Sequence, residues 1–259
     1  MNSAVSQEQI KLFQQDGFFV LESVIPETDL ELLRGQCQRF IDKMDARMDE
    51  EGNDILGINH RGQRYFIANC FREEPRLRAF LFGDLMADIC RVTLGDTFYL
   101  FWEQYVVKGA EMGMKFSWHQ DSGYVGHPEH KPYLTCWCAL DDMSEANGTV
   151  QVMPFSHIGI RTFVKHEVEE VSNDKVGYFG DDPGVLVECP AGSIVVFTSV
   201  NFHCSGVNTT DRLRRSYLAQ YSCEPLLSAD RSKLWGNAEP FLRDGESVVG
   251  GPPPDLPSR

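Results

Sequence analysis

From Phe98 onward the chain is a series of short apolar runs separated by clusters of glycine, proline, asparagine and aspartate. The runs cover residues 98–107, 114–119, 133–140, 149–153, 185–188, 193–199 and 214–222. Short runs of this kind between turn-forming residues are typical of β-strands. Seven of them in succession indicate a closed barrel or two packed sheets, such as a jelly roll.

The N-terminal part, residues 1–97, has a different pattern, with apolar residues mostly at helical spacing. Helices are expected at 6–15, 26–44 and 74–94, a short strand at 18–21, and a polar loop at 45–63. A chain of 259 residues is long enough to bury one large core. We therefore expect a single domain over 1–243, with a β core at 98–225. A loose tail should follow at 244–259, which is rich in glycine and proline.

Charge and cysteine usage narrow the class of protein. A net charge of −14 disfavours phosphate backbones and anionic membrane surfaces as partners. No apolar run is long enough to span a membrane, and the N-terminus lacks a basic segment followed by an apolar one. The eight cysteines form no Cys-x-x-Cys pair, and several lie in apolar runs, where buried reduced thiols are usual. We expect a cytoplasmic protein that binds neither nucleic acid nor membranes.

A candidate metal site lies in the β region. His119 and Asp121 are two residues apart on a strand-like run, so their side chains point to the same face. His203 follows another strand-like run, 193–199, and is a candidate third ligand. Two histidines and one carboxylate leave the opposite coordination positions open, as non-haem Fe(II) oxygenases require. The three-residue motif is common by chance, and a single histidine is more often a surface or hydrogen-bonded residue than a metal ligand.

Two adjacent arginines follow the second histidine on the next expected strand. A guanidinium there would pair bidentately with a dicarboxylate cosubstrate. Because side chains alternate along a strand, only one of Arg214 and Arg215 can face inward. Periodicity does not decide between them, and both are also compatible with an exposed surface.

Several short motifs occur in a specific order along most of the chain. They are 13–21 (FQQDGFFVL), 103–108 (EQYVVK), 118–121 (WHQD), 137–142 (WCALDD), 145–148 (EANG) and 203–210 (HCSGVNTT) with the arginines after it. In this order the chain resembles the phytanoyl-CoA dioxygenase family of Fe(II)- and 2-oxoglutarate-dependent oxygenases. It departs from the family at 154–157 (PFSH), where Pro-Gly-Ser-His is common, and at 109–110 (GA), where Pro-Pro is frequent. These departures bear on substrate shape more than on metal chemistry.

The resemblance implies a fold and a set of site residues. The fold is mainly β with flanking helices around a double-stranded β-helix of the jelly-roll or cupin type. Fe(II) is the metal, held by His119, Asp121 and His203, and 2-oxoglutarate and O2 are the cosubstrates. The family places its cosubstrate arginine eleven residues after the second histidine, which is Arg214 here. Further cosubstrate contacts correspond to Gln120, Trp137 and Ser205, with Gln104 and Lys108 on the pocket wall.

The activity implied is hydroxylation of a small organic molecule, with release of succinate and CO2. Asp121 favours this outcome because related halogenases lack the carboxylate. Four readings stay open: this hydroxylation, the same iron site directing desaturation, cyclisation or epimerisation, a non-catalytic metal or 2-oxoglutarate sensor or scaffold, and a zinc hydrolase. The weakly patterned stretch 155–184 is a candidate lid. The sequence names neither the substrate nor the oligomeric state.

Overall fold

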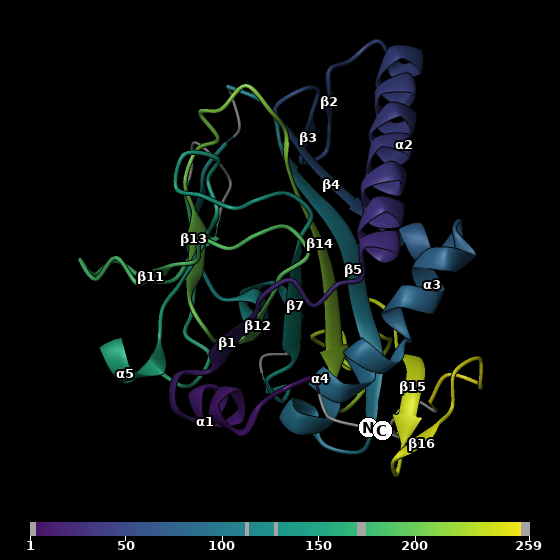
Figure 1. The fold of residues 1–259 in the computed structure, drawn as a ribbon, viewed down its shortest axis with the longest axis vertical. Helices are drawn as coiled ribbons and strands as arrows, with labels where there is room; N and C mark the ends of the chain where they lie inside the picture. The colour runs from purple at the N-terminus through teal and green to yellow at the C-terminus, as the bar shows by residue number, and fades with distance from the viewer. Residues whose placement is uncertain (1–3, 112–113, 127–128, 170–174, 255–259) are drawn as a thin grey trace.

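Two antiparallel β-sheets form the body of the protein (Figure 1). The computed structural model describes residues 4–111, 114–126, 129–169 and 175–254. The ten-stranded major sheet has the order β1 (Phe18–Leu21), β12 (Ile194–Thr198), β7 (Leu134–Ala139), β14 (Arg214–Ser222), β5 (Phe98–Lys108), β4 (Arg64–Ala68), β3 (Asn59–His60) and β2 (Ile55–Leu56), with β15 (Glu239–Arg243) and β16 (Glu246–Ser247) attached to β5. The minor sheet has the order β11 (Val185–Leu186), β8 (Val150–Val152), β13 (His203–Ser205) and β6 (Phe116–His119).

The space between the two sheets is filled by an apolar cluster. Val106, Trp137 and Leu218 come from the major sheet, while Val150 and Val152 come from the minor sheet. Successive side chains alternate between the two faces of a strand, so only every second residue of β5, β7 and β14 enters this space. This arrangement is a double-stranded β-helix, and the expected mainly β fold with flanking helices is confirmed.

Helices cover the outer face of the major sheet (Figure 1). They are α2 (Glu27–Glu51), α3 (Pro75–Leu81) and α4 (Asp84–Leu94). The other helices are α1 (Gln7–Asp16), α5 (Phe155–Ile158), η1 (Cys70–Arg72) and η2 (Asp121–Tyr124). Aromatic side chains join these layers, with ring centroids 6.3 Å apart for Phe40 and Tyr105 and 6.2 Å apart for Phe80 and Tyr217. The outward residues of β5 and β14 are therefore committed to packing against helices.

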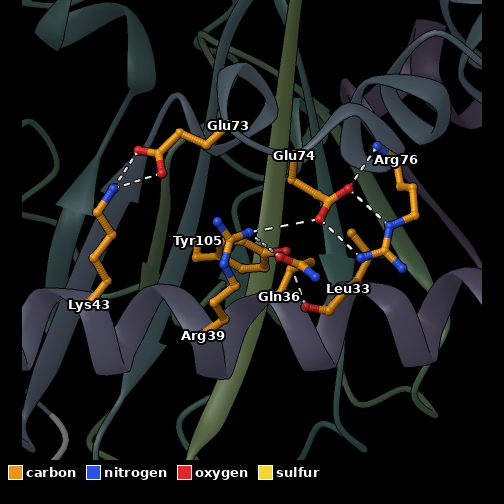
Figure 2. A network of polar contacts seen from close by, with 8 residues as sticks. All are labelled: Leu33, Gln36, Arg39, Lys43, Glu73, Glu74, Arg76 and Tyr105. Atoms are coloured by element: carbon orange, nitrogen blue, oxygen red, sulfur yellow. Dashed lines mark hydrogen bonds and ion pairs between the residues drawn. The ribbon is translucent and has the colours of Figure 1, made fainter.

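Polar contacts fix α2 against the start of α3 (Figure 2). Glu74 accepts hydrogen bonds from the backbone N–H and the guanidinium of Arg76, and its carboxylate lies 3.8 Å from Arg39 of α2. Lys43 forms a second bridge to Glu73 at 2.7 Å. Several of these side chains are substantially exposed, so each pair adds little stability. The contacts join α2 to the segment that leads into α3.

Three expected boundaries are wrong in the helical part. The helix expected to end near residue 44 continues to Glu51, because Met48 repeats the spacing of Met44 and is fully buried. The helix expected over 74–94 is two helices, with Phe82 and Gly83 between them. Part of the region read as a polar loop forms β2 and β3, and the unpredicted strand β4 follows and pairs with β5 along its whole length.

The C-terminal prediction is wrong for its first residues. Strands β15 and β16 form a hairpin whose turn includes Asp244 and Gly245, and the N–H of Val248 donates to the carbonyl of Phe241. The chain that was expected to be a loose tail from residue 244 is therefore attached to the sheet at least as far as Val248. Residues 255–259 of that tail lie outside the described residues. Among the described residues, no helix combines the length and apolar character needed to cross a membrane.

Candidate functional site

The three expected metal ligands converge between the ends of two minor-sheet strands. β6 ends at His119 and β13 begins at His203, and these two residues are direct partners in the antiparallel register. Asp121 follows at the start of η2. One potential ligand atom from each side chain lies within 4.8 Å of the others, and Nε2 of His203 is 3.5 Å from Oδ1 of Asp121. The structure therefore brings together the residues that the motif singled out.

Backbone carbonyls orient both imidazole rings. Nδ1 of His119 lies 2.7 Å from the carbonyl oxygen of Ser117, and Nδ1 of His203 lies 3.2 Å from that of Asn201. A carbonyl oxygen can only accept, so the proton belongs on Nδ1 and the lone pair on Nε2. Two neutral imidazole nitrogens and one carboxylate oxygen are the donor set that non-haem Fe(II) sites use. The residues present fit the metal that the family requires.

Two residues that the sequence did not single out hold the carboxylate. The hydroxyl of Thr135 donates to Oδ2 of Asp121 at 2.6 Å, and Nε2 of Gln220 donates to the same oxygen at 3.0 Å. Both come from the inner face of the major sheet, where Thr135 and Gln220 are direct partners in the register. Strand alternation could have indicated both residues, because Thr135 shares a face with Trp137 and Gln220 shares one with Arg214.

Arg214 lies in the interior, whereas its neighbour Arg215 lies outside. Arg214 is 1% exposed, its guanidinium carbon lies 5.6 Å from the ring centroid of Trp137, and its Nε has no hydrogen-bond acceptor. Among the described residues no carboxylate lies within ion-pair distance of it. Burial lowers the pKa of Arg214 to about 9. Arg215 instead donates to Asp141 at 3.0 Å, and this hydrogen bond raises its pKa.

Lys108 is a second buried cation beside Arg214. The two residues are direct partners on β5 and β14, and Lys108 is fully buried. Its Nζ donates to Oγ of Ser205 at 2.7 Å and to the carbonyl of Gly206. Because Ser205 lies two residues after His203, Lys108 spans from the major sheet to the metal-bearing minor sheet. The expected residues Arg214, Lys108, Ser205 and Trp137 thus form one cationic end of the interior.

Gln104 and Gln120, the two other residues expected near the cosubstrate, have hydrogen-bond partners outside the cationic end. Gln104 shares the inner face of β5 with Lys108, and its side-chain oxygen accepts a hydrogen bond of 3.2 Å from Nε1 of Trp102. Gln120 is a correction, because its side chain binds the 155–184 stretch instead of facing the metal site. Its Nε2 donates to the carbonyls of Thr162 and Val200, and its Oε1 accepts from the N–H of Val164. A residue between two ligands on a strand points to the opposite face, and Gln120 does so.

The stretch read as a candidate lid is anchored beside the metal site through His166. The backbone N–H of Gln120 donates to Nε2 of His166 at 2.8 Å, and burial lowers the pKa of this imidazole. A cavity of about 510 Å³ lies between this stretch and the minor sheet, and includes Phe116, Phe179 and Ser205 in its wall but none of the three candidate ligands. It is a neighbour of the metal site and not the site itself. Residues 170–174 of the expected lid lie outside the described residues.

Two facing sheets that enclose a set of two histidines and one carboxylate define the class of non-haem Fe(II) oxygenases. A profile described as phytanoyl-CoA dioxygenase matches residues 13–216, and the chain belongs to that family. It is therefore an Fe(II)- and 2-oxoglutarate-dependent dioxygenase that uses O2.

Relatives and solved structures match over nearly the whole chain. Ectoine dioxygenase of Stutzerimonas stutzeri is 24% identical over 242 residues, which span 85% of this chain and 78% of the relative. The α-ketoglutarate-dependent carbocyclase SnoK of nogalamycin biosynthesis has a TM-score of 0.70 at 19% identity, covering 92% of this chain and 95% of SnoK. EctD from S. alaskensis, solved with 2-oxoglutarate and 5-hydroxyectoine, has a TM-score of 0.70 at 20% identity, covering 97% and 89%. The two structures share the fold.

Proposed function

We propose that this dioxygenase hydroxylates a small organic molecule and converts 2-oxoglutarate to succinate and CO2. The observation that carries the proposal is a pair of features inside one β-helix. Three potential ligand atoms of His119, Asp121 and His203 converge within 4.8 Å, and Arg214 is buried there with an unpartnered Nε. A zinc hydrolase would use the first feature and has no need for the second.

The metal would be held by Nε2 of both histidines and by Oδ1 of Asp121. When bound there, Fe(II) together with 2-oxoglutarate supplies the activation of O2 that oxidation of an unactivated C–H bond requires. The protein keeps the two rings in the tautomer that presents Nε2, through the carbonyls of Ser117 and Asn201. The carboxylate of Asp121 would be a metal ligand, and because related halogenases lack this carboxylate, its presence favours hydroxylation over halogenation.

Arg214 would bind the distal carboxylate of 2-oxoglutarate. A buried guanidinium without a paired anion is costly, so a carboxylate that enters beside it recovers a large electrostatic penalty. Trp137 packs against the guanidinium, which also donates to Oγ of Ser216 and to the carbonyl of Gly148. Lys108, fixed by Ser205, adds a second positive charge at the same end of the interior. Together these residues make this end suited to a carboxylate, such as the distal carboxylate of 2-oxoglutarate.

The primary substrate is proposed to be a small molecule. The family and the relative of Stutzerimonas stutzeri are named for phytanoyl-CoA and ectoine, and neither is a macromolecule. The net charge of −14 supports the proposal that nucleic acid is not a partner. We also propose a cytoplasmic location, because all eight cysteines are free thiols and six of them are buried.

Succinate formation tests the function. The protein is incubated with Fe(II) or Zn(II), with and without O2, and with a panel of carboxylic acids, amino acids and coenzyme A thioesters. We expect succinate only with Fe(II) and O2, a substrate that stimulates it, and a product with one added oxygen atom. A product that has lost two hydrogen atoms would indicate desaturation or cyclisation, and one of unchanged mass would indicate epimerisation. Absence of any succinate from an Fe(II)-loaded protein would overturn the proposal in favour of a sensor.

A further inference from the structure

The carboxylate of Asp121 has one oxygen that is fully occupied by protein donors and one that is not. Oδ2 accepts from the hydroxyl of Thr135 at 2.6 Å and from Nε2 of Gln220 at 3.0 Å. Nε2 of Gln220 also lies 3.0 Å from Oγ1 of Thr135. Oδ1 instead faces Nε2 of His203 at 3.5 Å. The two oxygens of one ligand therefore have different surroundings.

The direction of these hydrogen bonds follows from the donor inventory. Oγ1 of Thr135 accepts one hydrogen from the amide of Gln220, so its own hydrogen is available for Oδ2 of Asp121. The same amide nitrogen lies 3.0 Å from Oδ2 and donates to it as well. A carboxylate oxygen has two lone pairs, and both of those on Oδ2 are used. No lone pair on Oδ2 remains for a metal ion.

The two donors are placed by the sheet and not by a loop. Thr135 is fully buried on β7, Gln220 is 6% exposed on β14, and the two residues are paired in the register. Asp121 belongs to the segment after β6 of the minor sheet. The contacts thus join the ligand to the opposite sheet, whose packing fixes where the donors stand.

We propose that Thr135 and Gln220 are positioning residues that force Asp121 to bind the metal through Oδ1 alone. The inference rests on the proposed function and adds a requirement to it. Three single-atom protein ligands would keep coordination positions open for a chelating cosubstrate and O2. A carboxylate that bound through both oxygens would remove one of them. The pair therefore reserves the position that the reaction needs.

Metal binding by the protein without cosubstrate tests the proposal. Co(II) affinity is measured by anaerobic calorimetry, and Co(II) absorption reports the coordination number before and after 2-oxoglutarate is added. The variants are Thr135→Val and Gln220→Leu, which keep the approximate volume and remove the donors. We expect Co(II) binding to weaken by about 10- to 100-fold in each, as is usual for the loss of a hydrogen bond to a metal ligand. The cobalt spectrum should also change, because Oδ2 becomes free to coordinate.

Two controls separate positioning from general packing. Thr135→Ser restores the hydroxyl and should recover both affinity and spectrum. Thr149→Val removes another fully buried threonine hydroxyl, which donates to the carbonyl of Val187, and should leave Co(II) binding unchanged. Wild-type affinity and spectrum in both Thr135→Val and Gln220→Leu would overturn the inference. Failure of the wild-type protein to bind Co(II) would instead overturn the metal site, so the two failures are distinguishable.

Discussion

Each face of β14 carries one buried or half-buried arginine, and the two arginines differ in their partners. On the inner face Arg214, Leu218 and Gln220 look into the space between the sheets, and on the outer face Arg215 and Tyr217 look toward the helices. Arg215 has a carboxylate partner in Asp141, whereas Arg214 is more deeply buried and has none among the described residues. The two adjacent arginines therefore allow a direct comparison of a paired and an unpaired guanidinium on one strand.

The difference shows that the positive charge without a carboxylate partner lies on the inner face of the strand. The outer Arg215 is matched by Asp141 of the same chain. The inner Arg214 donates only to the neutral oxygens of Ser216 and Gly148, and a buried cation without its anion costs stability until an anion binds. The neighbouring strand β5 shows a partial exception, since the outward Glu103 is fully buried and its pKa is raised to about 7. Burial dominates this shift, while Tyr217 and the backbone amides of 69–71 act against it.

The largest expected effect is on the inner side, at the metal ligands. His119→Ala, Asp121→Ala and His203→Ala should each abolish 2-oxoglutarate-dependent succinate formation, because each removes one of three metal donors. The fold should persist, since the ligands lie at strand ends outside the main apolar clusters. Succinate assays and thermal unfolding of the metal-free proteins measure the two properties. Normal 2-oxoglutarate consumption in any of these variants would contradict its assignment as a ligand.

The next largest effect is on the pH dependence of stability and comes from Glu103 on the outer face. The pKa of Glu103 is about 7 when folded and close to 4.5 when unfolded, so the folded protein retains a proton that the unfolded chain releases. The contribution of Glu103 to the free energy of unfolding is fully present below pH 4.5 and is lost as pH rises through about 7. The change is roughly 3 kcal/mol. Glu103→Gln should remove this part of the pH dependence. Urea unfolding at pH 5 and pH 8 provides the measurement, and parallel pH profiles for the two proteins would refute the account.

Arg214→Ala should raise the 2-oxoglutarate concentration needed for half-maximal activity. The change removes charge-assisted hydrogen bonds worth about 1.5–3 kcal/mol, which corresponds to roughly 10- to 150-fold. Steady-state succinate formation at varied 2-oxoglutarate measures it, with unfolding curves to verify the fold. Arg215→Ala is the matched control and should leave the requirement unchanged. If Arg215→Ala were the more damaging change for 2-oxoglutarate, the assignment of the inner face would be wrong.

The smallest effect should be the stability loss of Arg215→Ala itself. Its pair with Asp141 is partly exposed, with 23% and 20% of the two side chains accessible, so solvent screens the interaction. We expect a loss on the order of 1 kcal/mol in the free energy of unfolding. Asp141→Asn should give a similar loss, and the double variant should lose less than the sum. Strict additivity would show that the pair contributes no coupling energy.

The β region and the placement of His119 beside Asp121 could be predicted from the sequence because both depend on short-range patterns, whereas His203 joins them through the pairing of β6 with β13. Spacing of two along a strand placed His119 and Asp121 on one face, and alternation limited the cosubstrate arginine to one of two residues. Alternation could not say which face of β14 is inner, since both faces are largely buried. That choice depends on helices packing against Tyr217 and Tyr221, which is a tertiary fact.

The misses have physical causes as well. Thr135 and Gln220 are ordinary strand residues, and only the register of β7 against β14 brings them to Asp121. β4 was missed because its polar surroundings resembled a loop, although pairing with β5 decides its structure. The interpretation of Gln120 as a cosubstrate contact ignored the same alternation that placed its two neighbours correctly. The errors at Thr135, Gln220 and β4 lie where long-range pairing outweighs the local pattern, whereas the local pattern was sufficient to place Gln120.

A crystal structure grown without O2, with Mn(II) in place of iron and with 2-oxoglutarate, tests the central claim most directly. We expect an anomalous metal peak bound by His119, Asp121 and His203, with Oδ1 as the only carboxylate oxygen on the metal. The distal carboxylate of 2-oxoglutarate should lie within hydrogen-bonding distance of Arg214. A metal bound elsewhere, or a distal carboxylate that contacts Arg215 or bulk solvent, would contradict the account.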